Sequence, residues 1–417
     1  MKSYIIEGGK VLNGEVNISG SKNASLPIIA ASILNGETTR LYNVPKIHDT
    51  QTTLEILKIL GCKIKVNSGK IEINSKNINK TEIPEDLMRQ MRSTVVLAGA
   101  LLGRFKEVRF SCPGGCEIGS RPIDLHLSAF RKLGIEVEEN AGFIYCKCDK
   151  IIGTDINLDF PSVGATENII LASVLAEGTT TISNAAMEPE IVDLANCLIK
   201  MGAKINGAGS NVIKITGVSN LKSIGYKIMP DRIEAGTFLC AAAITGGKIK
   251  LNNVVPTDLT PVIHKLKETG CQILEGKNYI QIQGPKKLKA VNIKTMPYPG
   301  FPTDLQQIFG SMLTVAKGTS VIVENIFENR FRYISELSRL GVKATTEGKM
   351  AVIQGRRKLA GAVVKSYDLR GGAGLIIAGL AAKGRTTVEN IEYILRGYEH
   401  IDLKLKSLGA NIKEVGD

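Results

Sequence analysis

Aromatic residues are scarce in this chain of 417 residues: tryptophan is absent, and aromatic residues make up only 5% of the sequence. Hydrophobic residues still account for 43% of it, so its cores must be built mainly from Ile, Leu, Val and Ala. This content excludes a disordered or fibrous chain, and the length favours two or three domains. Small and β-branched residues suit stacked helices packed on strands.

Long hydrophobic runs are also missing. Stretches such as 27–34, 94–102 and 375–382 are shorter than the ~20 residues that a membrane-spanning helix needs. Residues 1–10 carry neither the apolar stretch nor the cleavage site of a signal peptide. We therefore expect no membrane insertion and a cytoplasmic location.

Disulfide and metal patterns are absent as well. The eight cysteines lie scattered along the chain, unlike the framework of a small secreted domain, so we expect reduced thiols. Cys112 and Cys116 are four residues apart, but neither a second pair nor a histidine cluster completes a zinc site, so no metal is expected. Glycine-rich nucleotide loops, a serine-hydrolase elbow and a zinc-protease motif are also missing.

What the chain does have is an excess of positive charge. Lys and Arg number 53 and Asp and Glu 40, which gives a formal net charge of +13. Such an excess favours an anionic partner: a nucleic acid, an anionic membrane or a phosphorylated metabolite. Because the basic residues form no stripes and few aromatic residues could stack on bases, we expect no nucleic-acid binding.

A repeat of about 70 residues organises the chain. In each copy a helical pattern ends at a glycine and a strand pair follows, so the class is α/β. The glycines are Gly61, Gly134, Gly202, Gly270, Gly341 and Gly409. Most copies also carry an Asn-centred turn, at Asn43, Asn184, Asn253, Asn325 and Asn390. An open solenoid is the alternative, but such long copies and a closing strand favour a closed array.

The two ends of the chain complete one repeat. The last copy stops one strand short at 411–415, and residues 4–8 resemble the strand at 279–284. We infer that residues 1–21 pair with the C-terminal half. This predicts two domains of three repeats each, one covering 22–229 and the other discontinuous, with 1–21 and 230–417.

Two segments depart from the repeat pattern. Because the residues of such segments are not needed for packing the repeat, we expect functional residues there. The segment 111–122 is rich in glycine, as mobile lids are, and carries Cys116 close to Arg121, which favours a thiolate. A surface loop with an incidental cysteine is the alternative. The segment 298–305 sets Asp304 at the start of a helix, where it is expected either to cap the helix or to act as a base.

Basic residues at junctions form a third group: Lys22, Arg92, Arg330, Arg370 and Arg396. Singly, such residues are commonly solvated surface charges. Beside helix starts and turns, however, they make sites for phosphate or carboxylate groups. Drawn from both halves, the set predicts an anion held between the domains.

Eight motifs together carry a family resemblance. They are GSKNA (20–24), PGGCEIGSRPIDLH (113–126), PSVGAT (161–166), PDRIEAGTF (230–238), FPTDLQ (301–306), ENRF (328–331), DLR (368–370) and RGYE (396–399). Over essentially its whole length the chain resembles the UDP-N-acetylglucosamine 1-carboxyvinyltransferases, which are enolpyruvyl transferases. The resemblance implies two inside-out α/β barrel domains, each of three βαβαββ-type repeats, with the substrates bound between them.

The resemblance also implies a reaction. The enolpyruvyl group of phosphoenolpyruvate is transferred to the 3′-hydroxyl of UDP-N-acetylglucosamine by addition and elimination of phosphate, the first committed step of peptidoglycan synthesis. No metal or organic cofactor is implied. Fosfomycin, an epoxide, alkylates the family's loop cysteine, and some members carry an aspartate in its place, whereas this chain has Cys116. We therefore expect fosfomycin to inactivate this protein and Cys116→Asp to confer resistance.

Site residues follow from the same resemblance. Cys116 matches the proton donor to the methylene carbon of phosphoenolpyruvate, and Asp304 matches the residue that contacts the sugar hydroxyl and accepts its proton. Lys22, Arg121 and Arg396 match the phosphoenolpyruvate-binding positions. Arg330 and Arg370 match further family arginines. The UDP-sugar positions are matched by Asn23, Arg92, Arg121, Pro122, Ile123, Asp124, Leu125, Ser162, Val163, Gly164 and Ile326.

Rival functions stay open at this point. The shikimate-pathway enolpyruvyl transferase uses the same donor on a different acceptor, but the Cys116 loop argues against it. An RNA-end-processing protein would use a related repeat fold, and a silent paralogue would only bind ligands. Intact Lys22, Cys116, Asp304 and Arg396 argue against the silent paralogue. The sequence indicates no oligomeric state.

Overall fold

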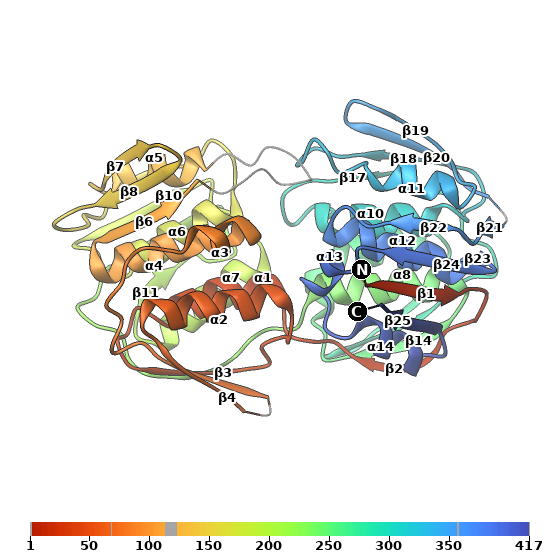
Figure 1. Cartoon of the computed structure of the whole chain (residues 1–417). Helices are drawn as coiled ribbons and strands as arrows, with labels where there is room; N and C mark the ends of the chain where they lie inside the picture. The colour runs from red at the N-terminus through yellow and green to blue at the C-terminus, as the bar shows by residue number, and fades with distance from the viewer. Residues whose placement is uncertain (1, 68, 113–122, 357, 417) are drawn as a thin grey trace. The chain divides into compact units, whose positions relative to one another are not determined.

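The structure is a computed structural model that describes residues 2–67, 69–112, 123–356 and 358–416. Contacts divide these residues into two compact units (Figure 1). The continuous unit comprises the described residues of 20–229, and the split unit those of 1–19 and 230–417.

Helices form the interior of the continuous unit. The buried helices α1 (Lys22–Ala31), α4 (Val96–Phe105) and α6 (Val163–Ser173) are apolar almost all round, and α4 packs against both α1 and α6. The amphipathic helices α2 (His48–Leu60), α5 (Asp124–Lys132) and α7 (Pro189–Lys200) bury one face each. The short helix α3 (Glu85–Gln90) and the 3₁₀ turn η1 (Arg92–Val95) lead into α4.

The described strands of this unit form three sheets, one for each repeat. Their orders are β13-β3-β5-β4, β6-β8-β7 and β11-β12-β10-β9. The strands are β3 (Thr38–Tyr42), β4 (Lys63–Asn67), β5 (Lys70–Asn74), β6 (Glu107–Ser111), β7 (Glu136–Asn140), β8 (Phe143–Lys147), β9 (Asp155–Asn157), β10 (Thr179–Ser183), β11 (Lys204–Asn206), β12 (Val212–Thr216) and β13 (Gly225–Lys227).

The split unit repeats this plan. Its interior helices α8 (Arg232–Thr245), α10 (Thr303–Leu313) and α12 (Leu369–Ala381) contact one another in all three pairs (Figure 1). A closed trio of helices is incompatible with an open solenoid, so that alternative is wrong for this unit. The remaining helical segments are η2 (Pro256–Leu259), α9 (Thr260–Glu268), α11 (Tyr333–Arg339), α13 (Glu392–Leu395) and α14 (Ile401–Ser407).

Three four-stranded sheets and one short strand pair enclose those helices among the described residues. The sheet orders are β22-β24-β1-β25, β15-β16-β14-β2 and β17-β18-β20-β19, and β21 pairs with β23. The strands are β1 (Ser3–Glu7), β2 (Asn13–Asn17), β14 (Lys248–Asn252), β15 (Gln272–Glu275), β16 (Tyr279–Gln283), β17 (Ile293–Lys294), β18 (Thr319–Val323), β19 (Lys343–Glu347), β20 (Met350–Gln354), β21 (Leu359–Ala360), β22 (Val363–Lys365), β23 (Ala382–Lys383), β24 (Arg385–Glu389) and β25 (Asn411–Val415). The predicted α/β fold with three repeats in each unit is confirmed.

The N-terminal strand completes the sheet of the last repeat, as the sequence predicted. β1 pairs antiparallel with β24 on one side and with β25 on the other, so that Tyr4 lies opposite Val388 and Glu414. β2 then runs parallel to β14 in the next sheet. A strand from a neighbouring repeat therefore closes each of these sheets.

The recurring asparagines fasten those closing strands. Asn43, Asn184 and Asn253 directly follow β3, β10 and β14, with φ between 55° and 60°. Their side-chain amides donate to the carbonyl of the first residue after the parallel neighbouring strand, at 2.7–2.9 Å. Asn325 and Asn390 make the same bond, at 3.0 and 3.4 Å. Asparagine recurs because it tolerates a left-handed backbone and also carries an amide.

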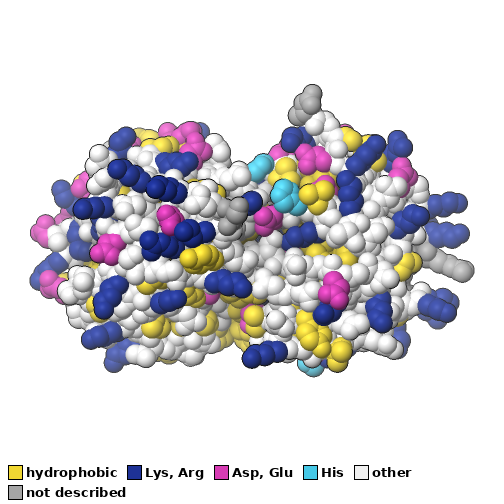
Figure 2. Space-filling model, turned by 90° about the horizontal axis from the view of Figure 1, so that it is seen from below, with side chains coloured by type: hydrophobic (Ala, Val, Ile, Leu, Met, Phe, Trp, Pro, Cys, Tyr) yellow, Lys and Arg dark blue, Asp and Glu magenta, His cyan; other side chains and the backbone are white. Residues whose placement is uncertain are grey.

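The basic side chains are dispersed over the surface seen in Figure 2, where Lys and Arg lie scattered over both units instead of forming one stripe. Within the described ranges, no helix is long and apolar enough to cross a membrane. The same residues hold no group of three or more His, Cys, Asp or Glu side chains arranged to bind a metal ion.

Candidate active site

Lys22 lies at the first position of α1 in the continuous unit. Ser21 caps this helix, because its side-chain oxygen accepts from the Ala24 amide at 3.3 Å. The Lys22 ammonium is 3.0 Å from a carboxylate oxygen of Asp49, at the start of α2, and the side chains are only 13% and 4% exposed. Asp49 was not among the predicted site residues. The signal that could have identified it is an acidic residue in the first turn of a helix. The partly buried Asn23 follows Lys22 on α1.

A buried carboxyl group lies within electrostatic range of Lys22. Burial raises the pKa of Glu167, on α6, well above its usual range, and Glu190 and Glu188 raise it further. Lys22 opposes this shift but does not reverse it. Burial and the two neighbouring carboxyl groups therefore favour the protonated form of Glu167 more than an exposed site would.

The predicted UDP-sugar segments 123–125 and 162–164 meet where α5 packs on α6. Ser162 caps α6, since its hydroxyl oxygen accepts from the Ala165 amide at 3.3 Å. A side chain on Gly164 would lie 3.1 Å from the imidazole of His126, so only glycine leaves this contact relaxed. Ile123 is buried just before α5, and Asp124 is exposed in its first turn.

His126 has a defined hydrogen-bonding role beside Gly164. Its Nδ1 lies 2.7 Å from the side-chain nitrogen of Asn168, which also donates to the Val95 carbonyl at 3.0 Å. Since the amide is the donor, a neutral His126 carries its proton on Nε2. His126 thus makes a buried polar contact between α5 and α6.

Three of the predicted residues, Cys116, Arg121 and Pro122, lie outside the described residues. Arg92 is the first residue of η1 and is partly buried. Among the described cysteines, burial raises the pKa of Cys62 and Cys146 to about 12 and also raises that of Cys197, Cys240, Cys271 and Cys148. Those six thiols are therefore poor nucleophiles. Cys112 is exposed.

Asp304 is the centre of a charged cluster in the split unit. One carboxylate oxygen accepts from Arg330 Nη2 at 2.7 Å, and the other from Arg370 Nη2 and Nε at 3.2 and 3.3 Å. The arginine side chains are each 3% exposed and that of Asp304 is 25% exposed. The expectation that Asp304 caps a helix is wrong: Pro302 occupies the N-cap position of α10, and the carboxylate binds arginines instead.

Arg370 contacts an aromatic ring and lies near acidic groups. Its guanidinium lies 5.3 Å from the centre of the Tyr398 ring, and Tyr398 Oη is 2.8 Å from the Thr237 hydroxyl. Burial works against the charge of Arg370, but Tyr398, Asp304 and Asp231 outweigh it and raise the pKa. Burial also disfavours the charged form of Tyr398 and raises its pKa to about 12, although Arg370 opposes this shift. The arginine therefore stays charged in an interior position.

The remaining predicted residues of this unit lie on nearby loops. Arg396 follows α13 and is partly buried. The Ile326 amide donates to Glu324 at 2.8 Å. Glu324, which the sequence did not single out, is 1% exposed and also accepts from Thr295 and Thr303. A buried carboxylate thus fixes the loop that carries Ile326.

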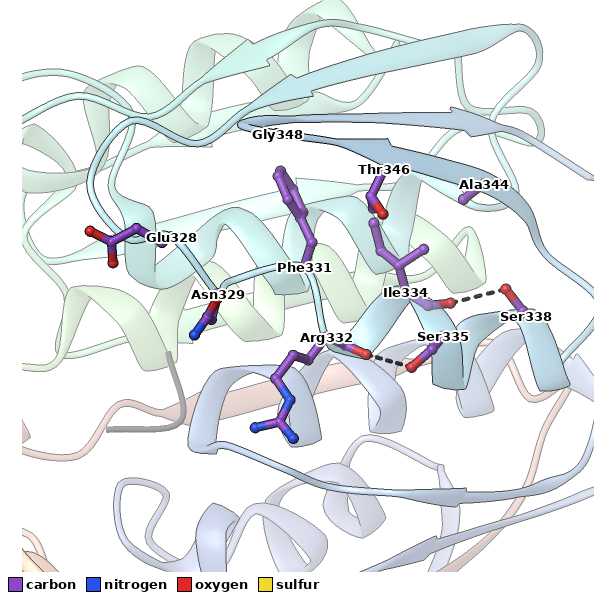
Figure 3. Close-up of a pocket in the computed structure, with 10 residues that line it drawn as sticks. All are labelled: Glu328, Asn329, Phe331, Arg332, Ile334, Ser335, Ser338, Ala344, Thr346 and Gly348. Carbon is purple, nitrogen blue, oxygen red and sulfur yellow. Dashed lines mark hydrogen bonds between the residues drawn. The ribbon is translucent and has the colours of Figure 1, made fainter. Parts of the chain in front are cut away.

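An open hollow of about 490 Å³ lies beside α11 and β19 (Figure 3). The Ser335 hydroxyl donates to the Arg332 carbonyl at 2.8 Å, and the Ser338 hydroxyl to the Ile334 carbonyl at 3.1 Å. Both hydroxyl groups therefore already donate to backbone carbonyl groups. Arg330 does not line the hollow, because its side chain reaches Asp304. We assign no ligand to this hollow.

Comparison with known proteins gives consistent matches over the whole chain. A family model described as EPSP synthase (3-phosphoshikimate 1-carboxyvinyltransferase) matches residues 6–405. UDP-N-acetylglucosamine 1-carboxyvinyltransferase 2 of Caldanaerobacter subterraneus subsp. tengcongensis is 51% identical over 416 residues, and its namesake in Carboxydothermus hydrogenoformans is 50% identical over 419. Each alignment covers 100% of both chains.

Solved structures support the same fold. The enolpyruvyl transferase NikO from Streptomyces tendae superposes with a TM-score of 0.90 at 24% identity, over 99% of both chains. EPSP synthase from Acinetobacter baumannii superposes with a TM-score of 0.77 at 20% identity, over 100% of both chains. With the family model and the full-length relatives, these matches show that the chain belongs to the EPSP synthase family of enolpyruvyl transferases.

Proposed function

We propose that this protein transfers the enolpyruvyl group of phosphoenolpyruvate to the 3′-hydroxyl of UDP-N-acetylglucosamine and releases phosphate, the first committed step of peptidoglycan biosynthesis. The observation that carries the proposal is the similarity to relatives named for this acceptor, which are 51% and 50% identical to the chain over its full length. The EPSP synthase structure, named for a shikimate phosphate reaction, is only 20% identical. The nucleotide sugar is therefore the favoured acceptor.

In the addition step, Asp304 orients the sugar hydroxyl and accepts its proton. Arg330 and Arg370 stabilise the carboxylate in its ionised form, and its 25% exposure leaves room for a hydroxyl to approach. The hydroxyl becomes acidic as its oxygen bonds to the central carbon of phosphoenolpyruvate, so even a stabilised carboxylate can take the proton. Cys116 protonates the methylene carbon at the same stage.

In the elimination step, the methyl carbon formed by that protonation returns a proton to the Cys116 thiolate as the carbon–oxygen bond to phosphate breaks, and the Asp304 carboxyl group gives its proton to the departing phosphate. Phosphate leaves and the enolpyruvyl ether remains, so the thiol and the carboxyl group return to their starting states. Lys22, Arg121 and Arg396 are assigned to the phosphate and carboxylate of phosphoenolpyruvate, whose charge shifts during the reaction. The Asp49 contact at 3.0 Å supports an ordered Lys22 ammonium.

The nucleotide sugar is assigned to Asn23, Arg92, residues 121–125, residues 162–164 and Ile326. The Ser162 cap and the tight contact between Gly164 and His126 support an ordered turn for the diphosphate. No metal or organic cofactor is needed, because a thiol and a carboxylate supply the proton transfers. A working thiol also requires a reducing compartment, which supports a cytoplasmic location.

A turnover assay with both acceptors tests the reaction. Purified protein is given phosphoenolpyruvate with either UDP-N-acetylglucosamine or shikimate 3-phosphate, and released phosphate is measured. We expect release only with the nucleotide sugar, and mass spectrometry should find the enolpyruvyl ether. Release that depends on shikimate 3-phosphate instead would overturn the proposal.

Fosfomycin tests the thiol separately. We expect it to inactivate the protein and to add covalently to Cys116, and Cys116→Asp to confer resistance. Arg121 precedes a proline, where trypsin cuts poorly, so one tryptic peptide contains both Cys112 and Cys116. Fragment ions must therefore locate the adduct, with Cys112→Ser as the matched control. An adduct that Cys112→Ser abolishes would sink the assignment of Cys116.

A further inference from the structure

Gln307 lies on α10, three residues after Asp304, and is 0% exposed. Both ends of its side-chain amide are used. The oxygen accepts from Arg330 Nη1 at 3.3 Å, and the nitrogen donates to an oxygen of Asp368 at 2.9 Å. The other oxygen of Asp368 caps α12 by accepting from the Arg370 and Gly371 amides, each at 2.9 Å. One buried amide thus contacts one arginine and the cap residue of the other.

We propose that Gln307 is a positioning residue that holds Arg330 and Arg370 on the two oxygens of Asp304. The inference deepens the proposed function, because Asp304 is the group assigned to the sugar hydroxyl. No family motif quoted above includes Gln307. Its role follows from the contacts of its amide.

The geometry of Arg330 makes Gln307 necessary. A guanidinium is planar, so two hydrogen bonds from different nitrogens fix both its position and its plane. Arg330 uses Nη2 for Asp304 and Nη1 for Gln307, while its Nε has no hydrogen-bond partner among the described residues. Without the Gln307 oxygen, Nη1 would be buried and unsatisfied, and the group would rotate away from Asp304 to find another acceptor.

The orientation of the Gln307 amide is itself fixed. Asp368 can only accept, so the amide nitrogen must face it and the oxygen must face Arg330. Asp368 therefore sets the amide through its side chain and positions the start of α12, where Arg370 lies, through its cap. The two arginines reach Asp304 from different segments of the chain, and Gln307 with Asp368 couples them.

The adjacent Gln306 provides a matched control. It is also 0% exposed on α10, but its nitrogen donates to Tyr333 Oη at 3.4 Å and its oxygen has no hydrogen-bond partner among the described residues. Methionine matches glutamine in length and has no amide. Gln307→Met therefore removes the relay, whereas Gln306→Met removes a buried amide elsewhere on the same helix.

Steady-state kinetics give the first readout. For Gln307→Met we expect kcat to fall about tenfold, the scale of one hydrogen bond to a charged group, with both KM values within about twofold. The acid limb of the kcat profile should move up by about one pH unit, since ionised Asp304 loses part of its support. Gln306→Met should show neither change. A purely structural role would alter stability without moving this limb.

A second readout needs no substrate. In protein labelled with carbon-13 at the aspartate carboxyl groups, the Asp304 signal is the one absent from Asp304→Asn. Its titration midpoint should rise in Gln307→Met and stay unchanged in Gln306→Met. If Gln307→Met does not fold, Asp368→Asn tests the relay, because its amide forces Gln307 to turn its own nitrogen toward Arg330. The midpoint should rise there too.

The outcomes separate the two proposals. Failure of the wild-type protein to use UDP-N-acetylglucosamine would refute the proposed function, and the carbon-13 titration would still decide the role of Gln307. An unchanged midpoint in the folded Gln307→Met or Asp368→Asn variant would overturn the positioning role. Equal shifts in Gln306→Met and Gln307→Met would overturn it as well.

Discussion

Asp304→Asn should destabilise the split unit, although substitutions of active-site charges commonly stabilise a protein. The wild-type carboxylate accepts three hydrogen bonds from two guanidinium groups that are each 3% exposed. Asparagine has a single side-chain oxygen and presents its nitrogen to the other arginine. The neutral asparagine removes the counter-ion that the two buried guanidinium groups share, and one of them also loses its hydrogen bond.

The magnitude follows from the contacts that survive. Arg370 keeps Asp231 and Tyr398 nearby, whereas Arg330 keeps Gln307 and the Phe327 ring at 4.8 Å. We expect the asparagine oxygen to stay with one arginine, so the loss is about one hydrogen bond to a charged group plus an uncompensated charge. This amounts to about 2–3 kcal/mol.

Scanning calorimetry at pH 7 measures the effect. For a unit of this size, 2–3 kcal/mol lowers the midpoint of its thermal transition by roughly 5–10 °C. Adding Arg330→Met to Asp304→Asn removes the Arg330 charge that Asp304 no longer balances and should recover part of the loss. An unchanged or higher midpoint in Asp304→Asn would refute the reasoning, as would a double variant that melts below the single one.

Three further predictions concern stability and Lys22. Burial raises the pKa of Glu234 from 4.5 to about 7 despite its contact with Lys404. Its proton stabilises the fold below pH 4.5, and this contribution is lost as the pH rises through 7. In urea titrations the wild type should therefore lose about 3 kcal/mol relative to Glu234→Gln across that range, and a pH-independent difference would contradict this. Lys22→Met should abolish phosphate release and lower the melting temperature, because the buried Asp49 loses this ion pair; adding Asp49→Asn should restore the melting temperature but not the activity. Asn184→Gly should cost about 1 kcal/mol for its lost hydrogen bond, and Asn184→Ala roughly 1 kcal/mol more for the left-handed backbone, so in urea unfolding an unchanged stability of Asn184→Gly would count against the role of this amide and equal costs would count against the backbone contribution.

The repeats were predictable because backbone geometry leaves marks in the sequence. Each helix-ending glycine, such as Gly202 with φ 106°, takes a conformation that other residues avoid. Four of the recurring asparagines combine a left-handed turn with an amide that holds the neighbouring strand: Asn43, Asn184, Asn253 and Asn390. The pairing of β1 also followed, since its resemblance to 279–284 identified an unpaired strand.

The partners of Asp304 could not be predicted in the same way. Arg330 and Arg370 lie 26 and 66 residues from it in sequence, and only the fold brings the three together. Helix capping was expected from local sequence alone, but the helix begins at Thr303 and Pro302 takes the cap position. Gln307 and Asp49 belong to no quoted motif, because burial rather than spacing defines their roles.

The position of β1 has a consequence for synthesis on the ribosome. This strand is made long before its partners β24 and β25, which span residues 385–415. At about 5–20 residues per second, roughly 20–80 s pass before those partners emerge. During that time the continuous unit is translated in full and can fold, while Tyr4 and Ile6, both buried in the finished protein, await their sheet. Until then β1 is an unpaired apolar strand, which is the kind of segment that chaperones protect from aggregation.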